Sequence, residues 1–405
     1  MKPMYLPDEI KTIMSSLSDG GFENYVVGGC VRDHLMGNTP NDYDMTTNAL
    51  PEQVKDCLGE YRIIDTGIKH GTVTVIINGM PVEITTFRTD GDYKDNRHPD
   101  SVSFTGNIKD DLSRRDFTVN AVAYAPQTGF VDLFGGRDDI EKKLIRCVGD
   151  PDKRFNEDGL RILRAMRFAS QLGFIIEPET SKSIHKNREL LKNISSERIL
   201  SELYKLLCGE GASYIISDYA DVIKIFIPSL STDERFYETV KGINRLPADK
   251  ILRTSLLFDG MSKEHCTEAL RFLRADKKTI KAVSELSEIR DADVGTTRQE
   301  IRRFVSDNSF TALERLIALR RAKGTEPQKT DLAEKLMEEV RADGDCVSLA
   351  DLKINGRDIK KLGESDGVRI GEIIERIYGL VLDGSLKNER EILIAAASEI
   401  IRKSF

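Results

Sequence analysis

Two short stretches decide the fold: Gly28-Gly29-Cys30-Val31-Arg32-Asp33 and, a few residues later, Asn41-Asp42-Tyr43-Asp44-Met45. The apolar run Tyr25-Val26-Val27 before them is typical of a short buried strand. The two glycines predict a tight turn at which the backbone approaches a ligand closely. Val31 to Met36 reads as the start of a helix, whose free N–H groups would face that turn and favour an anion.

Asp42 and Asp44 are separated by one residue. On a strand this spacing places both carboxylates on one face, because successive side chains alternate. Two adjacent carboxylates repel each other unless a hard cation lies between them. Taken singly, such a pair is usually a solvated strand face, and a glycine pair is usually a plain turn. Together they favour metal-assisted phosphoryl or nucleotidyl transfer. The dinucleotide fingerprint and the P-loop motif are both absent.

Three further motifs follow in order along the chain: Arg114-Arg115-Asp116-Phe117-Thr118-Val119-Asn120-Ala121, then Asp132-Leu133-Phe134-Gly135-Gly136, then Glu157-Asp158-Gly159-Leu160-Arg161-Ile162-Leu163-Arg164-Ala165-Met166-Arg167-Phe168. With the first two stretches, they resemble the motifs of the tRNA nucleotidyltransferase and poly(A) polymerase family over residues 25–168. The rest of the chain is similar more loosely. The resemblance implies an α+β fold with a polymerase-β-like head, built on a mixed or antiparallel sheet, followed by an all-α neck, body and tail.

Chain length and periodicity agree with several domains. A chain of 405 residues is too long for one compact core. Val73–Asn78 and Val82–Phe87 are β-rich runs joined at Gly79-Met80, and Pro51–Leu58 is predicted to be a helix with proline at its start. From about Asp152 apolar residues recur at helical spacing. We therefore predict a catalytic head at 1–148, a base-recognising neck at 149–208, a body at 209–330 and a tRNA-binding tail at 331–405.

Charge and cysteine content narrow the function classes. The net charge of −7 is unusual for a nucleic-acid enzyme, but the charge is unevenly distributed. Residues 1–150 carry a net of −8 and residues 153–205 a net of +4, which suits a metal-binding head and a phosphate-binding helical segment. The six scattered cysteines and the lack of a long apolar run predict a cytoplasmic protein without a membrane span. No protein partner is implied.

The resemblance assigns the acidic residues to metal binding. Asp42 and Asp44 are implied to bind two Mg²⁺ ions, one activating a primer 3′-hydroxyl and the other holding the triphosphate. Glu83, in Val82-Glu83-Ile84, is a candidate third catalytic carboxylate, with a solvated strand-face acid as the equal alternative. Asp33 is more simply explained as an acid at a helix entry.

Glycines and arginines are the candidate nucleotide-binding residues. Gly28, Gly29 and Arg32 map onto the family's triphosphate cradle, and an ion pair of Arg32 with Asp33 or Asp42 is the alternative. Arg114 and Arg115 are adjacent, so in regular structure they cannot share a face. One is expected to contact nucleotide while the other pairs with Asp110 or Asp111, and the resemblance assigns Arg115 to the nucleotide. The sequence leaves two roles open for Asp116 and Asn120: each could bind a ribose hydroxyl or cap a helix.

A helix beginning at Glu157 is implied to read the base. On it Asp158 and Arg161 would share a face at i,i+3. Asp accepts hydrogen bonds and Arg donates them, so the pair matches the amine and ring nitrogen of C or A and rejects G or U. The alternative is a surface pair of Glu157 with Arg161. Arg164 and Arg167 continue the arginine stripe and are candidate nucleotide-binding residues.

Two other segments carry weaker signals. Residues 89–102 hold Gly91, Asp95, Arg97 and Pro99, a composition typical of a mobile loop, and resemble the loop that family members need for the final A. The segment 352–358, with Lys353 and Arg357, resembles the family's tRNA-contacting tail.

The resemblance implies an enzyme that adds C, C and A to tRNA 3′ ends from CTP and ATP without a template, releasing pyrophosphate. Poly(A) polymerase and a CC-adding enzyme are the alternatives within the family. A non-catalytic tRNA-binding relative is the alternative of another class, and the intact Asp42 and Asp44 argue against it.

Overall fold

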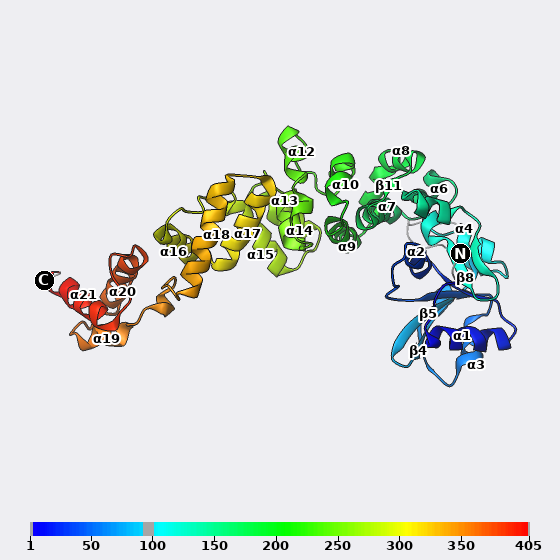
Figure 1. The fold of residues 1–405 in the computed structure, drawn as a ribbon, viewed down its shortest axis with the longest axis horizontal. Coiled ribbons are helices and arrows are strands. Elements are labelled where there is room, and N and C mark those ends of the chain that lie inside the picture. The colour runs from blue at the N-terminus through cyan, green and yellow to red at the C-terminus, as the bar shows by residue number, and fades with distance from the viewer. Residues whose placement is uncertain (1–2, 92–100, 404–405) are drawn as a thin grey trace. The chain divides into compact units, whose positions relative to one another are not determined.

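The computed structural model describes residues 3–91 and 101–403 of the chain (Figure 1). It divides into two compact units. The first comprises Met1–Leu230 with Phe272–Ala275, and the second comprises Ser231–Arg271 with Asp276–Phe405. No helix among the described residues is long and apolar enough to cross a membrane. The predicted four-part division into head, neck, body and tail is finer than these two units and stays a prediction.

A mixed β-sheet forms the centre of the N-terminal part, as predicted. Within the described residues seven strands lie in the order β3-β4-β5-β2-β1-β8-β9. All neighbours are antiparallel except β2 and β5, which are parallel. The strands are β1 (Asn24–Val27), β2 (Asp44–Thr47), β3 (Arg62–Gly67), β4 (Thr72–Ile77), β5 (Met80–Thr86), β8 (Val122–Ala125) and β9 (Gly129–Asp132).

The β4–β5 hairpin turns one residue earlier than predicted. Asn78 and Gly79 form the turn, with φ of 50° and 84°, and β5 already begins at Met80. Two successive positive φ angles are those of the two-residue turn that matches strand twist, and Asn-Gly is its favoured sequence. The expected turn at Gly79-Met80 was therefore wrong by one position, because Asn78 tolerates the left-handed conformation.

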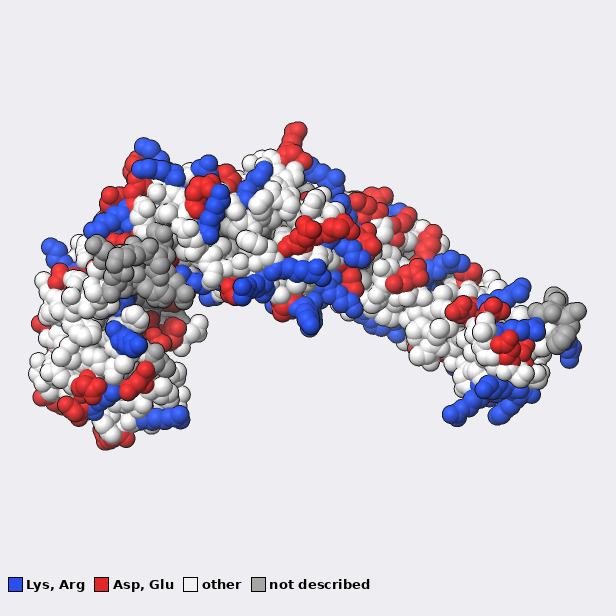
Figure 2. All heavy atoms as spheres, turned by 180° about the vertical axis from the view of Figure 1, so that it is seen from behind, with Lys and Arg blue, Asp and Glu red and all other residues white. Residues whose placement is uncertain are grey.

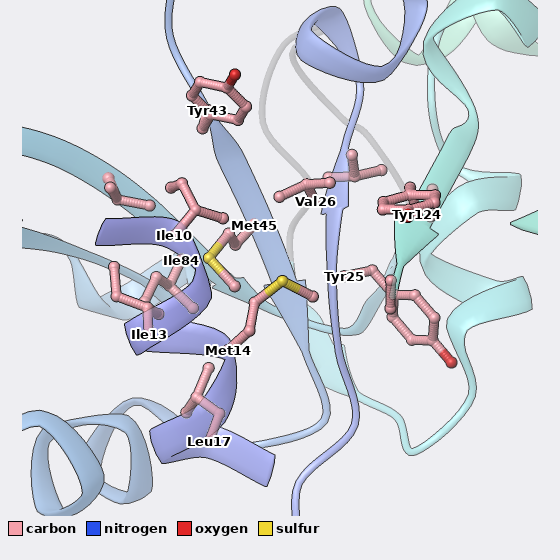
Figure 3. Close-up of a cluster of buried hydrophobic side chains, with 14 of the residues drawn as sticks. Ile10, Ile13, Met14, Leu17, Tyr25, Val26, Tyr43, Met45, Ile84 and Tyr124 are labelled. Atoms are coloured by element: carbon pink, nitrogen blue, oxygen red, sulfur yellow. The ribbon is translucent and has the colours of Figure 1, made fainter. Parts of the chain in front are cut away.

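Helices cover one side of this sheet (Figures 1 and 3). Helix α1 (Asp8–Asp19) buries Ile10, Ile13, Met14 and Leu17, which recur every three or four residues along one face. In Figure 3 they point toward strand residues that include Met45 on β2 and Ile84 on β5. Helix α3 (Pro51–Leu58) has proline in its first turn, as predicted.

Shorter elements surround the sheet. They are α2 (Gly29–Leu35), the 3₁₀ turn η1 (Ile68–His70), the paired strands β6 (Arg88–Asp90) and β7 (Val102–Phe104), α4 (Ile108–Ser113), η2 (Thr118–Asn120) and α5 (Gly136–Glu141). Helix α2 begins at Gly29, two residues before the predicted start, so the second glycine is part of the helix.

Helices dominate the chain after residue 150, as predicted. The first unit continues with α6 (Pro151–Glu157), α7 (Leu160–Leu172), α8 (Pro178–Asn187), η3 (Arg188–Asn193), α9 (Ser196–Leu207), α10 (Ala212–Asp218) and α11 (Ala220–Ile223). A short parallel pair joins β10 (Leu144–Ile145) to β11 (Ile175–Ile176). This pair ties the start of the helical region to the end of α7.

The second unit is helical throughout its described residues, and two separate hydrophobic cores lie within residues 294–397. One core includes Ile301, Leu313 and Val340, and the other includes Ile359, Ile377 and Leu393. Its elements are α12 (Glu234–Val240), η4 (Ile243–Arg245), α13 (Lys250–Leu257), α14 (Lys263–Phe272, whose last residue clusters with the first unit), α15 (Lys277–Ile289), α16 (Arg298–Asp307), α17 (Phe310–Lys323), α18 (Pro327–Ala342), η5 (Leu349–Asp351), α19 (Gly356–Lys361), α20 (Gly367–Leu382) and α21 (Arg390–Lys403).

Candidate active site

The aspartate pair lies at the start of a central strand. Asp44 is the first residue of β2, where it is paired in register with Val27 of β1 and with Glu83 of β5. Asp42 precedes the strand, so the two aspartates are not both on it as expected. The alternation nevertheless extends back to Asp42, because Asp42 and Asp44 are exposed while Tyr43 and Met45 are buried.

The carboxylates of this group repel one another. Although part of Asp44 is exposed, the surrounding protein removes much of the hydration of its carboxyl group, which raises its pKa to about 6, and the charges of Glu83 and Asp42 contribute in the same direction. Arg115 acts in the opposite direction. A carboxyl group whose ionisation is disfavoured by neighbouring negative charge gains most from a bound cation, so these residues suit a hard divalent metal.

The donor set fits a metal that substrate helps to hold. Within the described residues no three or more His, Cys, Asp or Glu side chains gather closely enough to hold a metal ion by themselves. Mg²⁺ is usually bound by one or two carboxylates together with substrate phosphates and water. Asp42 and Asp44 supply the two carboxylates, and the remaining ligands would come from substrate and solvent.

The glycine turn lies beside this pair. Gly28 has φ of 81° and ψ of −129°, a conformation accessible almost only to glycine. A methyl group added there would lie 3.4 Å from Nη1 of Arg115. The turn therefore brings open backbone next to a guanidinium, which is suitable for an anion.

Arg32 adopts the ion pair that the sequence left open. Its Nε and Nη2 donate to Oδ1 of Asp33 at 2.9 and 2.7 Å, and its Nη1 donates to Oδ1 of Asn120 at 2.8 Å. The side chain is 11% exposed. Its assignment to the triphosphate stays a prediction.

Arg114 and Arg115 both bind one carboxylate, which the sequence reasoning did not expect. Arg114 donates to Oδ1 of Asp111 at 2.6 and 3.1 Å, and Arg115 donates to Oδ2 at 3.2 Å. The separation expected for regular structure does not apply here, because α4 ends at Ser113 and both arginines follow it and turn back to Asp111. Burial alone would raise the pKa of Asp111, but the two guanidinium groups hold it below its usual value.

Asp116 connects the second motif to helix α7. Its Oδ2 accepts two hydrogen bonds from Arg164, and its Oδ1 accepts from the backbone of Phe117 and from the side chain of Asn120. Burial alone would raise the pKa of Asp116, but the charge and hydrogen bonds of Arg164 hold it at about 2. This pair spans 48 positions, and no local pattern in the sequence signals it.

The predicted single helix from Glu157 is interrupted. Helix α6 ends at Glu157, Asp158 is extended with φ of −139° and ψ of 106°, and α7 begins at Leu160. Asp158 accepts from the N–H of Leu160 at 3.0 Å and from Arg198 at 3.0 Å. Asp158 and Arg161 therefore do not share a face of one helix. The reason is capping: an aspartate before a helix satisfies its free N–H groups better outside the helix than within it.

Each arginine of α7 has an acidic partner. Arg161 is 9% exposed and donates to Glu157 at 2.6 Å and to the carbonyls of Arg154 and Arg114. The ion pair of Glu157 with Arg161, the alternative that the sequence allowed, is thus present, although it is buried and not on the surface. Arg167 pairs with Glu202 of α9 at 2.8 Å. The predicted roles of Asp158, Arg161, Arg164 and Arg167 at the base stay predictions.

Three arginine side chains lie close to the ring of Phe168. The guanidinium groups of Arg32 and Arg164 lie 5.4 Å from the ring centre of Phe168, and that of Arg167 lies 3.9 Å from it. Cations over an aromatic face are attracted to the ring. Phe168 therefore holds together arginines from the glycine-turn helix and from α7.

A pocket beside the aspartates includes residues that sequence reasoning did not assign. Its lining combines Asp44 and Glu83 with Arg88, Arg114 and Arg115. Arg88 lacked a signal because it lies outside the recognised motifs. The proposed mobile loop can be followed only at its ends, since residues 92–100 lie outside the described residues.

Comparison with known proteins identifies the family of the chain. Residues 24–146 match the family model described as "Poly A polymerase head domain", residues 173–230 match the one described as "Probable RNA and SrmB- binding site of polymerase A", and residues 250–397 match the one described as "tRNA nucleotidyltransferase domain 2 putative". Among solved structures, the chain is similar to the Bacillus stearothermophilus CCA-adding enzyme in complex with CTP, with a TM-score of 0.79 and 32% identity, covering 100% of this chain and 99% of that one. The Thermotoga maritima CCA-adding enzyme complexed with tRNA(CCA) shares the fold, with a TM-score of 0.73, 23% identity and coverage of 98% and 96%.

Curated relatives match along the whole length. The CCA-adding enzyme of Geobacillus stearothermophilus is 37% identical over 402 residues, covering 98% of this chain and 97% of the relative. That of Limosilactobacillus fermentum is 34% identical over 408 residues, covering 99% and 100%. The chain therefore belongs to the family of CCA-adding enzymes, which are tRNA nucleotidyltransferases with a polymerase-β-like head and use a divalent metal.

Proposed function

We propose that this chain adds C, C and A in turn to the 3′ end of tRNA, using CTP and ATP and releasing pyrophosphate. The observation that carries the proposal is the position of Asp44. It lies in register with Glu83, is accompanied by Asp42, and adjoins the pocket that Arg115 lines beside the Gly28 turn. Carboxylates for metal and donors for phosphate thus meet at one strand end.

Each group of residues has a role in the proposed reaction. Two Mg²⁺ ions, when bound at Asp42 and Asp44, would activate the tRNA 3′-hydroxyl and neutralise the leaving pyrophosphate. The Gly28-Gly29 turn and Arg32 orient the triphosphate, and Arg115 adds a donor beside the turn. Glu83 adds negative charge beside Asp44 and favours metal binding there.

Base selection is proposed to depend on Asp158 and Arg161. Asp158 accepts a hydrogen bond from the exocyclic amine of C or A, and Arg161 donates to the adjacent ring nitrogen. G and U present the reverse pattern and would leave buried groups unpaired, at a cost of roughly 1–3 kcal/mol each. Arg164 and Arg167 add positive charge beside this pair, and the Asp116–Arg164 bond connects it to the head.

The C-terminal part is proposed to bind the body of the tRNA. Helix α19 carries the exposed residues Arg357, Lys360 and Lys361, and Lys353 is exposed just before it. Figure 2 shows lysines and arginines gathered over the part of the chain that contains this helix. Such side chains contact phosphates without reading sequence. We also propose a cytoplasmic location, in keeping with six cysteines that are all free thiols.

One assay separates the proposal from its alternatives. Purified protein is incubated with Mg²⁺ and tRNA that lacks its 3′ C-C-A, with each nucleotide alone and with both. We expect CTP alone to add two residues, and CTP with ATP to add C-C-A and stop, with one pyrophosphate released per addition. Long A tails would indicate a poly(A) polymerase, products that stop at C-C a CC-adding enzyme, and tRNA binding without extension a non-catalytic relative.

A further inference from the structure

The pocket beside the catalytic carboxylates has an acidic and hydroxylated floor and a cationic wall. Its floor includes Asp44 and Glu83 together with the hydroxyl groups of Thr72 and Thr85, which lie 3.0 Å from each other. Its wall includes Arg88, Arg114 and Arg115. The proposed function uses Asp44, Glu83 and Arg115, and it leaves the Thr72, Thr85 and Arg88 side of the pocket without a role.

Strand order places that side away from the glycine turn. The strands run β4-β5-β2-β1, with Thr72 on β4, Thr85 on β5, Asp44 on β2 and Gly28 directly after β1. Neighbouring strands lie about 4.8 Å apart, so Thr72 is roughly 14 Å from the strand that leads to the turn. The unassigned side of the pocket and the proposed triphosphate site therefore lie on opposite sides of Asp44.

In-line transfer requires that the two substrates approach the metal-binding carboxylates from opposite sides. The attacking 3′-hydroxyl and the leaving pyrophosphate must lie on opposite sides of the phosphorus that is transferred. If the triphosphate lies over the Gly28 turn, the end of the tRNA enters from the side of β5 and β4. That is the side of the pocket on which Arg88 lies, because it is the first residue of β6, two positions after the end of β5.

The charges of the wall suit a phosphodiester. Arg114 and Arg115 share Asp111, while Arg88 lies 3.3 Å and Arg114 lies 3.8 Å from Asp90. Both carboxylates of this wall are thus each bound by guanidinium groups. Arg88 is also fixed in place by a hydrogen bond to the carbonyl of His70. A guanidinium held at a defined position is suited to bind a phosphate oxygen.

We propose that Arg88 binds the phosphodiester that links the last two nucleotides of the tRNA 3′ end, and so positions the attacking hydroxyl. This inference rests on the proposed function. It assigns Arg88 to the RNA and not to the incoming nucleotide, whereas Arg115, which lies over the glycine turn, serves the nucleotide.

The first test separates binding of the two substrates. Arg88→Met removes the charge and keeps most of the side-chain length, and Arg62→Met, at an exposed position on β3 of the same sheet, is the matched control. We expect Arg88→Met to raise KM for tRNA about 10-fold, as the loss of one charge-assisted hydrogen bond would, with KM for CTP unchanged. An increase confined to KM for CTP would overturn the assignment.

The second test identifies the phosphate. A tRNA with a neutral methylphosphonate at its last linkage is compared with one modified a few linkages earlier. In the wild type the last-linkage substitution should cost about 10-fold in kcat/KM, and in Arg88→Met it should cost nothing further. A purely structural role of Arg88 would give independent, multiplicative losses, and that result would overturn the proposal.

Two arms keep the result interpretable. Circular dichroism and thermal melting check that Arg88→Met folds, and if it does not, Arg88→Lys takes its place. In Arg88→Lys the penalty of the neutral linkage must fall below that of the wild type, and an unchanged penalty would contradict the inference. If the wild-type chain adds no C or A to unmodified tRNA, the proposed function itself fails. If the wild type is active but the coupling is absent, only the role of Arg88 fails.

Discussion

Arg164 on α7 donates two hydrogen bonds, 2.9 and 2.5 Å long, to one carboxylate oxygen of Asp116. Asn120 extends this contact, since it donates to Asp116 at 3.3 Å and accepts from Arg32 at 2.8 Å. A continuous chain of hydrogen bonds therefore connects the helix after the glycine turn to the helix proposed to act in base recognition. In the proposed enzyme, this chain would hold the triphosphate site and the base site at a fixed distance.

Breaking the Arg164–Asp116 pair is predicted to destabilise the protein. Arg164→Met leaves Asp116 buried and without its main partner, while the side chain of Arg164 is 35% exposed and partly screened by solvent. We expect a loss of about 1–3 kcal/mol in the free energy of unfolding, below the 3–5 kcal/mol of a fully buried pair. Urea denaturation of Arg164→Met, Asp116→Asn and the double variant measures the loss and the coupling. If the stability losses of the two single variants simply add up in the double variant, Arg164 and Asp116 do not interact directly.

The same pair has a predicted pH dependence. The pKa of Asp116 is about 2 in the folded protein and close to its ordinary value of 3.8 when unfolded. A lowered pKa contributes stability above the unfolded-state value, and that contribution is lost as the pH falls from about 4 to 2. The stability difference between the wild type and Asp116→Asn should therefore shrink over this range. A difference that stays constant from pH 7 to pH 3 would contradict the low pKa.

Asp44 is predicted to reduce the stability of the metal-free protein at neutral pH. Its pKa is raised from 3.8 to about 6, so ionisation costs stability as the pH rises through this interval. Asp44→Asn should melt at a higher temperature than the wild type at pH 7.5, and the difference should vanish near pH 4. Mg²⁺ should raise the melting temperature of the wild type more than that of the variant. Asp19→Asn, at the exposed end of α1, is the control. Equal melting temperatures for Asp44→Asn and the wild type at pH 7.5 would refute the raised pKa of Asp44.

Gly28→Ala is predicted to impair nucleotide binding as well as stability. The backbone angles of Gly28 strain any other residue by about 1–3 kcal/mol, and the new methyl group would lie 3.4 Å from Arg115. KM for CTP should rise, with little change in KM for tRNA. Gly37→Ala also has positive φ, of 82°, but meets no atom within 4 Å, and it should affect stability alone. Similar kinetics for both variants would argue against a nucleotide at this turn.

Asp158→Ala is predicted to relax base selection. Loss of the acceptor should increase incorporation of UTP and GTP relative to CTP by about 10-fold, which corresponds to one hydrogen bond. Arg198→Ala removes the partner of Asp158 but keeps the carboxylate, so it should retain selectivity. Competition assays with labelled nucleotides report the ratio. A uniform loss of activity with unchanged ratios would mean that Asp158 only caps α7.

Local chemistry explains which features the sequence predicts well. The strand Asn24–Val27, the helix after Pro51 and the β4–β5 hairpin each depend on residues a few positions apart. The break at Asp158 and the sharing of Asp111 by two arginines depend on competition between local alternatives that have similar energies. At Asp158 and at Asp111, side-chain capping or pairing determines the local structure more strongly than the periodicity of the sequence does.

Partners that are distant in sequence could not be predicted. Asp116 meets Arg164 across 48 residues, and Arg167 meets Glu202 on another helix. Arg88 joins the pocket only because β5 lies beside β2 in the sheet. The motifs indicated which residues matter, whereas the tertiary fold determines which of them touch.

Asp42 and Asp44 are proposed to hold the metal ions on which nucleotide addition to tRNA depends. The most direct measurement is incorporation of radiolabelled CTP and ATP by Asp42→Asn/Asp44→Asn, alongside filter binding of tRNA. These substitutions keep shape and remove the charge that metal needs. We expect incorporation of both C and A to fall at least about 1,000-fold, while tRNA affinity stays within about 3-fold of the wild type. Turnover near the wild-type rate in the double variant would contradict this role.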